Sequence, residues 1–196
     1  MAFIELIGDD AASEDAQRLF DLDRDGAGEV PNFTRLFAHR PEVYEAWRAL
    51  KTAIADGMDL RRYELATLAA ARELRSTYCT AAHGAILADR FLDADTVRRL
   101  VSDHHAAGLD EVDVAVMDLA AKVARDATSV TQADVDRLRD LGLSDADVLD
   151  VVLAATARCF FSKTLDALGT PADAKYNALP LALRDAVTVG RPIATA

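Results

Sequence analysis

The sequence is 196 residues long, 51% of it is hydrophobic, and its formal net charge is −11 at pH 7. This length suits one domain with an additional arm, and the apolar share is sufficient for a sizeable core. The strong negative charge argues against partners that are themselves anionic, namely nucleic acids and acidic membrane surfaces.

The cysteines and the N-terminal segment bear on the cellular compartment. Two cysteines far apart in the sequence do not form a disulfide framework, which favours a reducing compartment. The first ten residues, MAFIELIGDD, lack the basic region and the long apolar core of a signal peptide. No apolar run approaches the roughly 20 residues that span a bilayer. We therefore expect a soluble, cytoplasmic protein without a membrane partner.

Residues 1–30 are predicted to form an N-terminal arm. Ser13 suits the N-cap of a short helix. The apolar stripe of this helix would consist of Ala16, Leu19 and Phe20. The next segment, DLDRDGAGEVPN (21–32), opens like a calcium-binding loop but lacks the bidentate glutamate that closes one. We interpret it instead as an acidic, glycine-rich turn.

The middle of the chain is predicted to be entirely helical. No proline occurs between Pro41 and Pro171, and alanine and leucine dominate without the alternation of a strand. One helix is expected from Pro41 to Gly57, and the next from Asp59 to a break at Arg75 and Ser76. A third runs from this break to about Phe91, and a fourth from Asp93 to about His104. Further helices begin at Asp110, at Thr131 and at Ser144, and the last of them reaches about Leu168. The fold class is thus all-α, with a helical domain over 31–170 and a less regular C-terminal tail over 171–196.

One stretch of this region, from Glu64 to Leu87, carries residues capable of chemistry. Cys79 and His83 are four residues apart, so a helix places both on one face, one turn apart. The break at Ser76 would place Cys79 in the first helical turn, where unpaired amides and the macrodipole favour an anion. His83 could accept the thiol proton, and Glu64 could hold the imidazole. The same three residues also have an ordinary interpretation as a buried cysteine, a core histidine and a solvated acid.

The remaining cysteine and histidines give weaker signals. Cys159 lies in the apolar segment VVLAATARCFF and is expected to be buried and inert. His104 and His105 could in principle bind zinc together with His83 or Cys79. Adjacent histidines point in different directions on a helix, and the sequence has no Cys-x-x-Cys or His-x-x-x-His pair. We therefore expect neither a metal ion nor another cofactor.

The order and spacing of Glu64, Ser76, Cys79 and His83 resemble the motif Glu-x11-Cys-x2-Cys-x3-His, with serine in place of the first cysteine. This motif marks the carboxymuconolactone decarboxylase superfamily in its alkylhydroperoxidase D-like (AhpD-like) branch. Segments 30–50 and 107–169 are also similar to the peroxidase-related members, so the resemblance covers most of 30–170. It implies an AhpD-like multi-helix bundle that assembles as a dimer, trimer or hexamer.

The resemblance also implies roles for the motif residues. Cys79 would be the thiol that attacks a peroxide, with His83 and Glu64 as the proton relay, and with Ser76 and Tyr78 beside them as substrate-binding or supporting residues. Ser76 stands where the family has its resolving cysteine, and serine cannot form a disulfide. Turnover would therefore need an external thiol reductant, or Cys159 brought close. The decarboxylase branch usually lacks the motif cysteine.

Three functions follow, of which we favour the first. It is an antioxidant oxidoreductase of the peroxidase type, which reduces a small peroxide at Cys79. The second is a decarboxylase or isomerase of a small carboxylate, with His83 and Glu64 as acid and base. The third is a non-catalytic helical oligomer in which the site has decayed to a binding pocket. A homo-oligomer is expected in each case, because the apolar helices offer more apolar surface than one core can hide.

Overall fold

The computed structural model describes residues 2–195, and every regular element in that range is a helix, as the sequence predicts. The α-helices are α1 (Glu14–Ala27), α2 (Asn32–Phe37), α3 (Pro41–Asp56), α4 (Leu60–Glu73), α5 (Thr77–Arg90), α6 (Ala94–Ser102), α7 (Glu111–Asp126), α8 (Gln132–Asp140), α9 (Asp145–Ala167) and α10 (Leu181–Val187). The 3-10 helices are η1 (Asp9–Ala11), η2 (His104–Ala106), η3 (Ala127–Ser129) and η4 (Ala174–Ala178). Within the described range, no helix has the length and apolar character needed to cross a bilayer.

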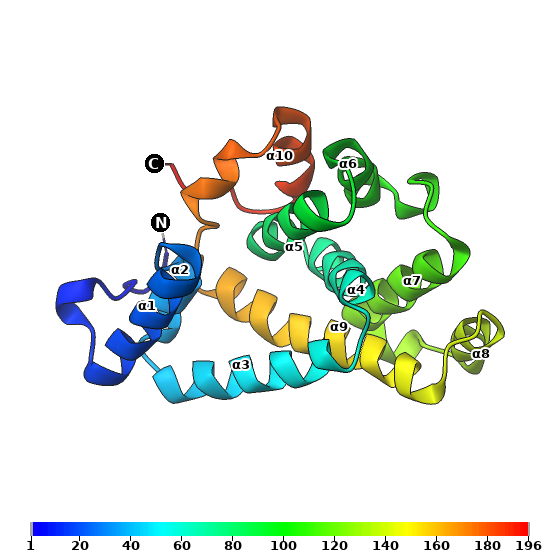
Figure 1. Cartoon of the computed structure of the whole chain (residues 1–196), viewed down its shortest axis with the longest axis horizontal. Helices are drawn as coiled ribbons and strands as arrows, with labels where there is room; N and C mark the ends of the chain where they lie inside the picture. The colour runs from blue at the N-terminus through cyan, green and yellow to red at the C-terminus, as the bar shows by residue number, and fades with distance from the viewer. Residues whose placement is uncertain (1, 196) are drawn as a thin grey trace.

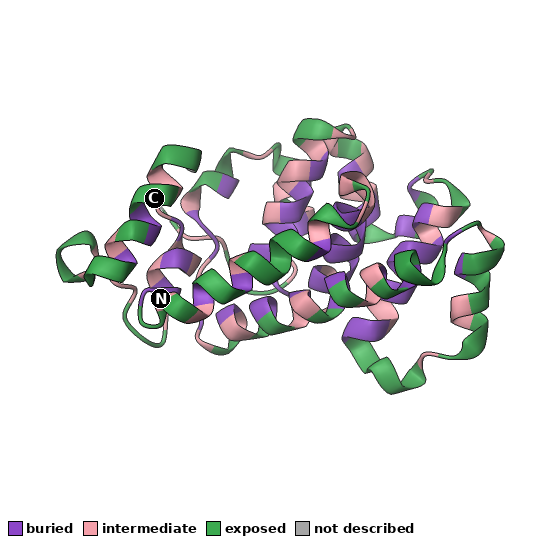
Figure 2. Ribbon diagram, turned by 60° about the horizontal axis from the view of Figure 1, so that its bottom comes forward, coloured by how far each residue is buried: buried purple, intermediate pink, exposed green. Residues whose placement is uncertain are grey.

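Helix α4 forms the centre of the fold, in contact with α5, α7 and α9 (Figure 1). Every residue from Tyr63 to Ala71 is buried. Much of this run is alanine, whose small side chain allows neighbouring helices to approach α4 from several sides. Exposed residues lie mainly on the outward faces of the surrounding helices (Figure 2). Glu64 belongs to the buried run, so this acid needs a partner inside the protein.

The connection between α4 and α5 sets the position of the motif residues. Arg75 has a left-handed backbone with φ of 56°, and Ser76 is the N-cap of α5, so the predicted break is confirmed. The backbone amide of Gly190 donates a hydrogen bond of 2.8 Å to the hydroxyl of Thr77. A Cβ atom at Gly190 would lie 2.0 Å from the carbonyl oxygen of Arg75, so only glycine fits there. The C-terminal segment thereby fixes the start of α5, and Cys79 lies in its first turn.

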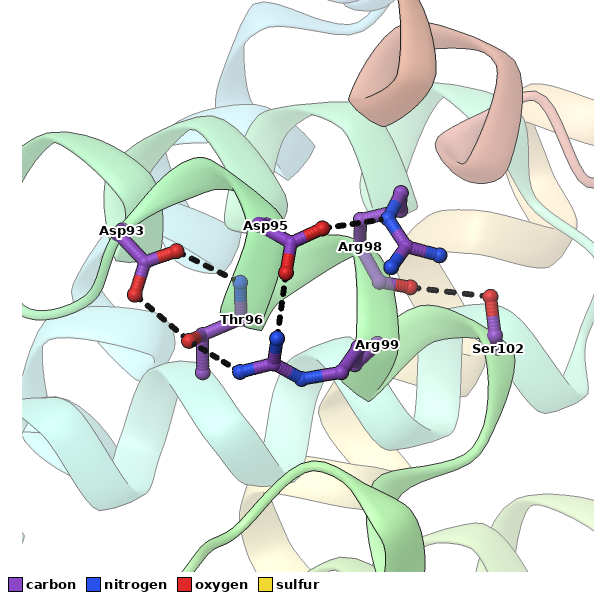
Figure 3. Close-up of polar contacts among 6 residues, drawn as sticks. All are labelled: Asp93, Asp95, Thr96, Arg98, Arg99 and Ser102. Carbon is purple, nitrogen blue, oxygen red and sulfur yellow. Dashed lines mark hydrogen bonds and ion pairs between the residues drawn. The ribbon is translucent and has the colours of Figure 1, made fainter.

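Polar side chains cap the helices and cover their outer faces, as α6 illustrates (Figure 3). Asp93 accepts hydrogen bonds from the backbone amide and the hydroxyl of Thr96, at 2.9 and 2.7 Å. Asp95 pairs with Arg98 and Arg99 one turn further along. The opposite face of α6 is apolar and buried, and it packs against α10. The predicted helix is therefore confirmed, although it ends at Ser102 instead of His104.

One prediction about the N-terminal part of the chain is wrong. The segment 21–32 is not one acidic turn, because α1 continues through Gly26 to Ala27 and is capped by Gly28, where φ is 78°. Asp21 bonds to Gln17 and Arg24 along this helix, which stabilises it despite the glycine, and a helical backbone does not have the shape of a calcium-binding loop. The tail beyond residue 171 is less regular than the middle of the chain, as the sequence predicts. It contains η4 and α10, and α10 is anchored by the buried side chains of Leu183 and Val187.

Candidate functional site

Glu64 and His83 form a buried hydrogen-bonded pair between α4 and α5. The distance between Glu64 Oε2 and His83 Nδ1 is 2.6 Å, and both side chains are almost inaccessible to solvent. The hydroxyl of Thr67 lies 3.2 Å from the same ring nitrogen and donates to the carbonyl oxygen of Tyr63 at 2.8 Å. The structure thus brings together two of the residues that the sequence singled out. Because Nδ1 faces Glu64, the other nitrogen, Nε2, is at the opposite edge of the ring.

The surroundings of this pair favour an ionised acid and a neutral base. Burial opposes ionisation of Glu64, but His83 and Arg158 outweigh it and hold the pKa of the carboxyl below its usual value. Burial and then the positive charge of Arg158 lower the pKa of His83, against the opposing effect of Glu64. A neutral His83 then donates its Nδ1 proton to the Glu64 carboxylate. Nε2 is left unprotonated and can act as a base.

Cys79 is buried and bonds to a residue that the sequence analysis did not identify, Arg158 of α9. The Nη1 atom of Arg158 lies 3.4 Å from Cys79 Sγ. Burial alone would lower the pKa of Arg158, but Cys79 and Tyr63 outweigh it and raise the pKa, so the guanidinium remains charged. The buried guanidinium thus places a charged hydrogen-bond donor directly beside the sulfur. The sequence signal that could have identified Arg158 is an arginine in an otherwise apolar stretch of helix.

The expected hydrogen bond between Cys79 and His83 is not found within residues 2–195. Both residues instead line one cavity of about 340 Å³, between α3, α5 and α9. The other residues lining it are Asp23, Phe33, Tyr44, Trp47, Arg48, Lys51, Thr52, Tyr78, Ala82, Arg158 and Phe161. A proton could therefore pass between Cys79 and His83 through a molecule bound in this cavity.

Ser76 and Tyr78, the two supporting residues that the sequence proposed, have different surroundings. Ser76 is fully buried, and its hydroxyl has no hydrogen-bond partner among the described residues. Tyr78 lines the cavity and donates a hydrogen bond of 2.5 Å to Asp173 Oδ2. Burial, together with Asp173, raises the pKa of Tyr78 well above its usual value, so the phenol stays protonated. The other Asp173 oxygen accepts from the backbone amide of Asn32 at 2.8 Å, so Tyr78 ties the site to both ends of the chain.

The remaining candidates do not line this cavity. Cys159 is only half-buried and does not line the cavity, and burial raises the pKa of its thiol. Among the described residues, His104 and His105 pair with Asp118 and form no hydrogen bond with His83 or Cys79. Their Nε2 atoms lie 2.8 and 2.9 Å from one oxygen of Asp118, and the three donor groups are close enough to hold a metal ion. The second oxygen of Asp118 accepts a hydrogen bond from Arg137, whose positive charge opposes metal binding there.

One segment of the chain matches the model of a described protein family. Residues 41–103 match the family model described as the carboxymuconolactone decarboxylase family. This segment includes α3, α4, α5 and α6, and therefore Glu64, Ser76, Cys79 and His83. Among curated protein sequences, no match is found.

Several solved structures share the fold over nearly the whole chain. The alkylhydroperoxidase AhpD core of a peroxidase-related protein from Ralstonia eutropha JMP134 is 22% identical, with a TM-score of 0.83 over 97% of this chain and 98% of that one. A peroxidase-related protein from Silicibacter sp. TM1040 is 23% identical, with a TM-score of 0.82 over 90% and 94%. A variant of the debrominase Bmp8 in complex with 2,3,4-tribromopyrrole is 12% identical, with a TM-score of 0.74 over 95% and 98%. The family model thus matches the segment that carries the motif, and the solved structures show that nearly the whole chain has the AhpD-like fold.

Proposed function

We propose that this protein is a thiol-dependent oxidoreductase that reduces a small organic peroxide at Cys79 and is recycled by an external thiol. The observation that carries the proposal is the position of Cys79 Sγ, which lies on a cavity wall and is hydrogen-bonded by the charged guanidinium of Arg158. A structural cysteine needs neither an adjacent cation nor access to a cavity. The names of two solved relatives, both described as peroxidase-related, agree with this chemistry.

The first step oxidises the sulfur. The thiol proton of Cys79 passes through a molecule bound in the cavity to Nε2 of His83, and the resulting imidazolium is held by Glu64 at 2.6 Å. The thiolate attacks one oxygen of the peroxide, a sulfur–oxygen bond forms and the oxygen–oxygen bond breaks. The departing alkoxide takes the proton from His83 and leaves as an alcohol. Cys79 is then a sulfenic acid, and the peroxide has been reduced by two electrons.

The second step returns Cys79 to the thiol. Ser76 cannot form a disulfide, and Cys159 does not line the cavity, so a resolving thiol has to come from another molecule. That thiol attacks the sulfenic sulfur, water leaves, and a mixed disulfide remains. A second external thiol releases Cys79 and forms the oxidised reductant. The two steps balance overall, because one peroxide and two thiols give one alcohol, one water and one disulfide.

The test compares the two cysteines in the full-length chain. Each variant, Cys79→Ser and Cys159→Ser, is treated with an organic hydroperoxide in the presence of a sulfenic-acid trap and examined by intact-mass spectrometry. We expect Cys159→Ser to gain the trap and Cys79→Ser to gain none. With added thiols, Cys159→Ser should consume peroxide and Cys79→Ser should not. If Cys79 stays a free thiol in the folded protein and reacts readily after denaturation, the proposal is overturned.

An acid–base enzyme acting on a small carboxylate is the second candidate. The Glu64–His83 pair supports it, because the neutral imidazole can act as a base without help from Cys79. The two candidates differ in which residue is required. Activity on a carboxylate that survives Cys79→Ser and is lost in His83→Gln would favour the acid–base enzyme.

A further inference from the structure

The cavity beside Cys79 has an unusual charge balance for this protein. Acidic residues outnumber basic ones by 33 to 22 in the whole chain, yet three of the cavity-lining side chains are cations: Arg48, Lys51 and Arg158. In the part of the chain that the structure describes, none of the three forms an ion pair with a carboxylate. One acid, Asp23, also lines the cavity, and the Glu64 carboxylate lies behind His83, so the three cations still outnumber the two acids. Unpaired cations in a cavity favour an anionic ligand.

The three cations differ in depth. Arg158 is buried beside Cys79, Arg48 is half-buried, and Lys51 is exposed. Arg48 and Lys51 are one turn apart on α3, so they lie on the same face of that helix. Their positions suit the charged end of a ligand, whereas Arg158 is next to the reacting sulfur.

Arg158 also has donor capacity that the protein leaves unused. Its Nη1 atom bonds to Cys79, but its Nε atom is buried without a hydrogen-bond partner among the described residues. A buried donor without a partner is energetically unfavourable, and a ligand oxygen would satisfy it. The guanidinium is held in place by two aromatic rings, at 5.9 Å from the Trp47 centroid and 5.5 Å from that of Phe161.

The apolar part of the cavity is aromatic. The rings of Trp47 and Phe161 are stacked at 5.0 Å, and Phe33 meets Phe161 edge-on at 5.4 Å. Tyr44 adds a fourth ring, 5.9 Å from Phe33. Flat aromatic walls fit a flat apolar ligand. A volume of about 340 Å³ is at the lower end for small-molecule sites, so the ligand has to be small.

We propose that the cavity binds small aromatic anions, with a carboxylate held by Arg48 and Lys51 and with the ring against Trp47. This inference rests on the proposed function, since it names the substrate class of the same site: a small aromatic hydroperoxide that bears a carboxylate. The charged end stays near α3, and the peroxide oxygen reaches Arg158 Nε and Cys79 Sγ. The neutral analogue loses the contact to the two cations and binds more weakly.

The test uses benzoate and its uncharged counterpart benzamide as a matched pair of probes. Isothermal titration calorimetry on the full-length protein gives both affinities. Trp47 is the single tryptophan of the chain and lines the cavity, so its fluorescence reports whether a probe binds there. We expect benzoate to bind at least tenfold more tightly than benzamide and to change the Trp47 emission. The preference should shrink as salt is added.

A double variant and a control of equal charge locate the effect. Arg48→Gln combined with Lys51→Gln should weaken benzoate binding about tenfold and leave benzamide unchanged. Arg90→Gln combined with Lys163→Gln removes the same charge at exposed positions outside the cavity and should leave both affinities unchanged. Equal affinity for the two probes, an unaffected double variant, or binding without a change in Trp47 emission would overturn the inference.

Binding and chemistry can fail separately in these measurements. The Cys79→Ser variant removes the reacting thiol and should keep the preference for benzoate. If the preference is present but Cys79 does not react with peroxide, the proposed function fails and the ligand class stands. If Cys79 reacts with uncharged hydroperoxides and the preference is absent, the proposed function stands and the ligand class is wrong.

Discussion

The sharpest prediction concerns Arg158, which we propose to replace with methionine. Methionine has a similar length and fits an aromatic environment, but it carries neither the charge nor the hydrogen-bond donors of arginine. The substitution therefore removes the contact to Cys79 Sγ at 3.4 Å and leaves the volume between Trp47 and Phe161 filled. All measurements use a Cys159→Ser parent, so that Cys79 is the single thiol.

The expected loss of reactivity follows from the strength of this contact. Hydrogen bonds to charged groups contribute about 1.5–3 kcal/mol, and about 1.4 kcal/mol corresponds to a tenfold change in rate. The second-order rate constant of Cys79 with an organic hydroperoxide at pH 7 should therefore fall roughly ten- to a hundredfold. Stopped-flow mixing followed by quantification of the remaining thiol measures it. Arg158→Lys keeps the charge but not the planar donor group, so its rate constant should lie between those of the parent and of Arg158→Met.

Stability should change in the opposite direction. Arg158 is buried, no carboxylate pairs with it in the described part of the chain, and its Nε is without a partner. Burial of a charged group costs several kcal/mol of desolvation free energy, and an apolar side chain of similar size does not have this cost. The melting temperature of Arg158→Met should therefore rise by several degrees. An unchanged rate constant in a folded variant would refute the role of Arg158, and a slower reaction with a lower melting temperature would point to structural damage.

Three further predictions follow from the structure. Because the folded protein keeps the pKa of His83 below the ordinary 6.5, protons bind the unfolded chain preferentially as the pH falls. The melting temperature of the wild type should thus decrease below about pH 6.5 more steeply than that of His83→Gln; parallel curves would contradict this. Ser76→Cys should be tolerated, because the buried hydroxyl has no hydrogen-bond partner among the described residues. After mild peroxide treatment this variant should form an internal disulfide with Cys79, which intact-mass spectrometry detects. Persistent sulfenic acid at Cys79 would contradict this prediction. We also predict that the protein self-associates through exposed apolar residues on one face of α9, namely Leu149, Leu153 and Phe160. Light scattering at micromolar concentration measures this, and a monomer would contradict it.

The helical elements could be predicted because their signals are local. Ser13, Asp59 and Asp93 cap the helices that their positions in the sequence indicate, each through its own side chain. The break at Arg75 was visible in the same way. The segment 21–32 was misinterpreted because turn-forming residues also occur inside helices when side-chain pairs along the helix compensate for them.

The candidate site was only partly visible in the sequence. Cys79 and His83 share one helix, and their relative placement follows from its period. Glu64 could be added through the resemblance to a family motif. Arg158 could not, because it is 79 residues away from Cys79 and meets it only where α9 packs beside α5. An arginine in an apolar segment signals that a partner exists and does not say which one.

The sequence alone therefore determined the helices and the residues capable of chemistry, since capping and periodicity act over a few residues. Only the tertiary structure decided that Cys79 faces Arg158 instead of His83, and that cations and aromatic rings line the same cavity. The overall charge of −11 gave no indication of that local positive charge. Electrostatic interactions depend on distance and burial in space, and both are set by how the helices pack rather than by their order in the chain.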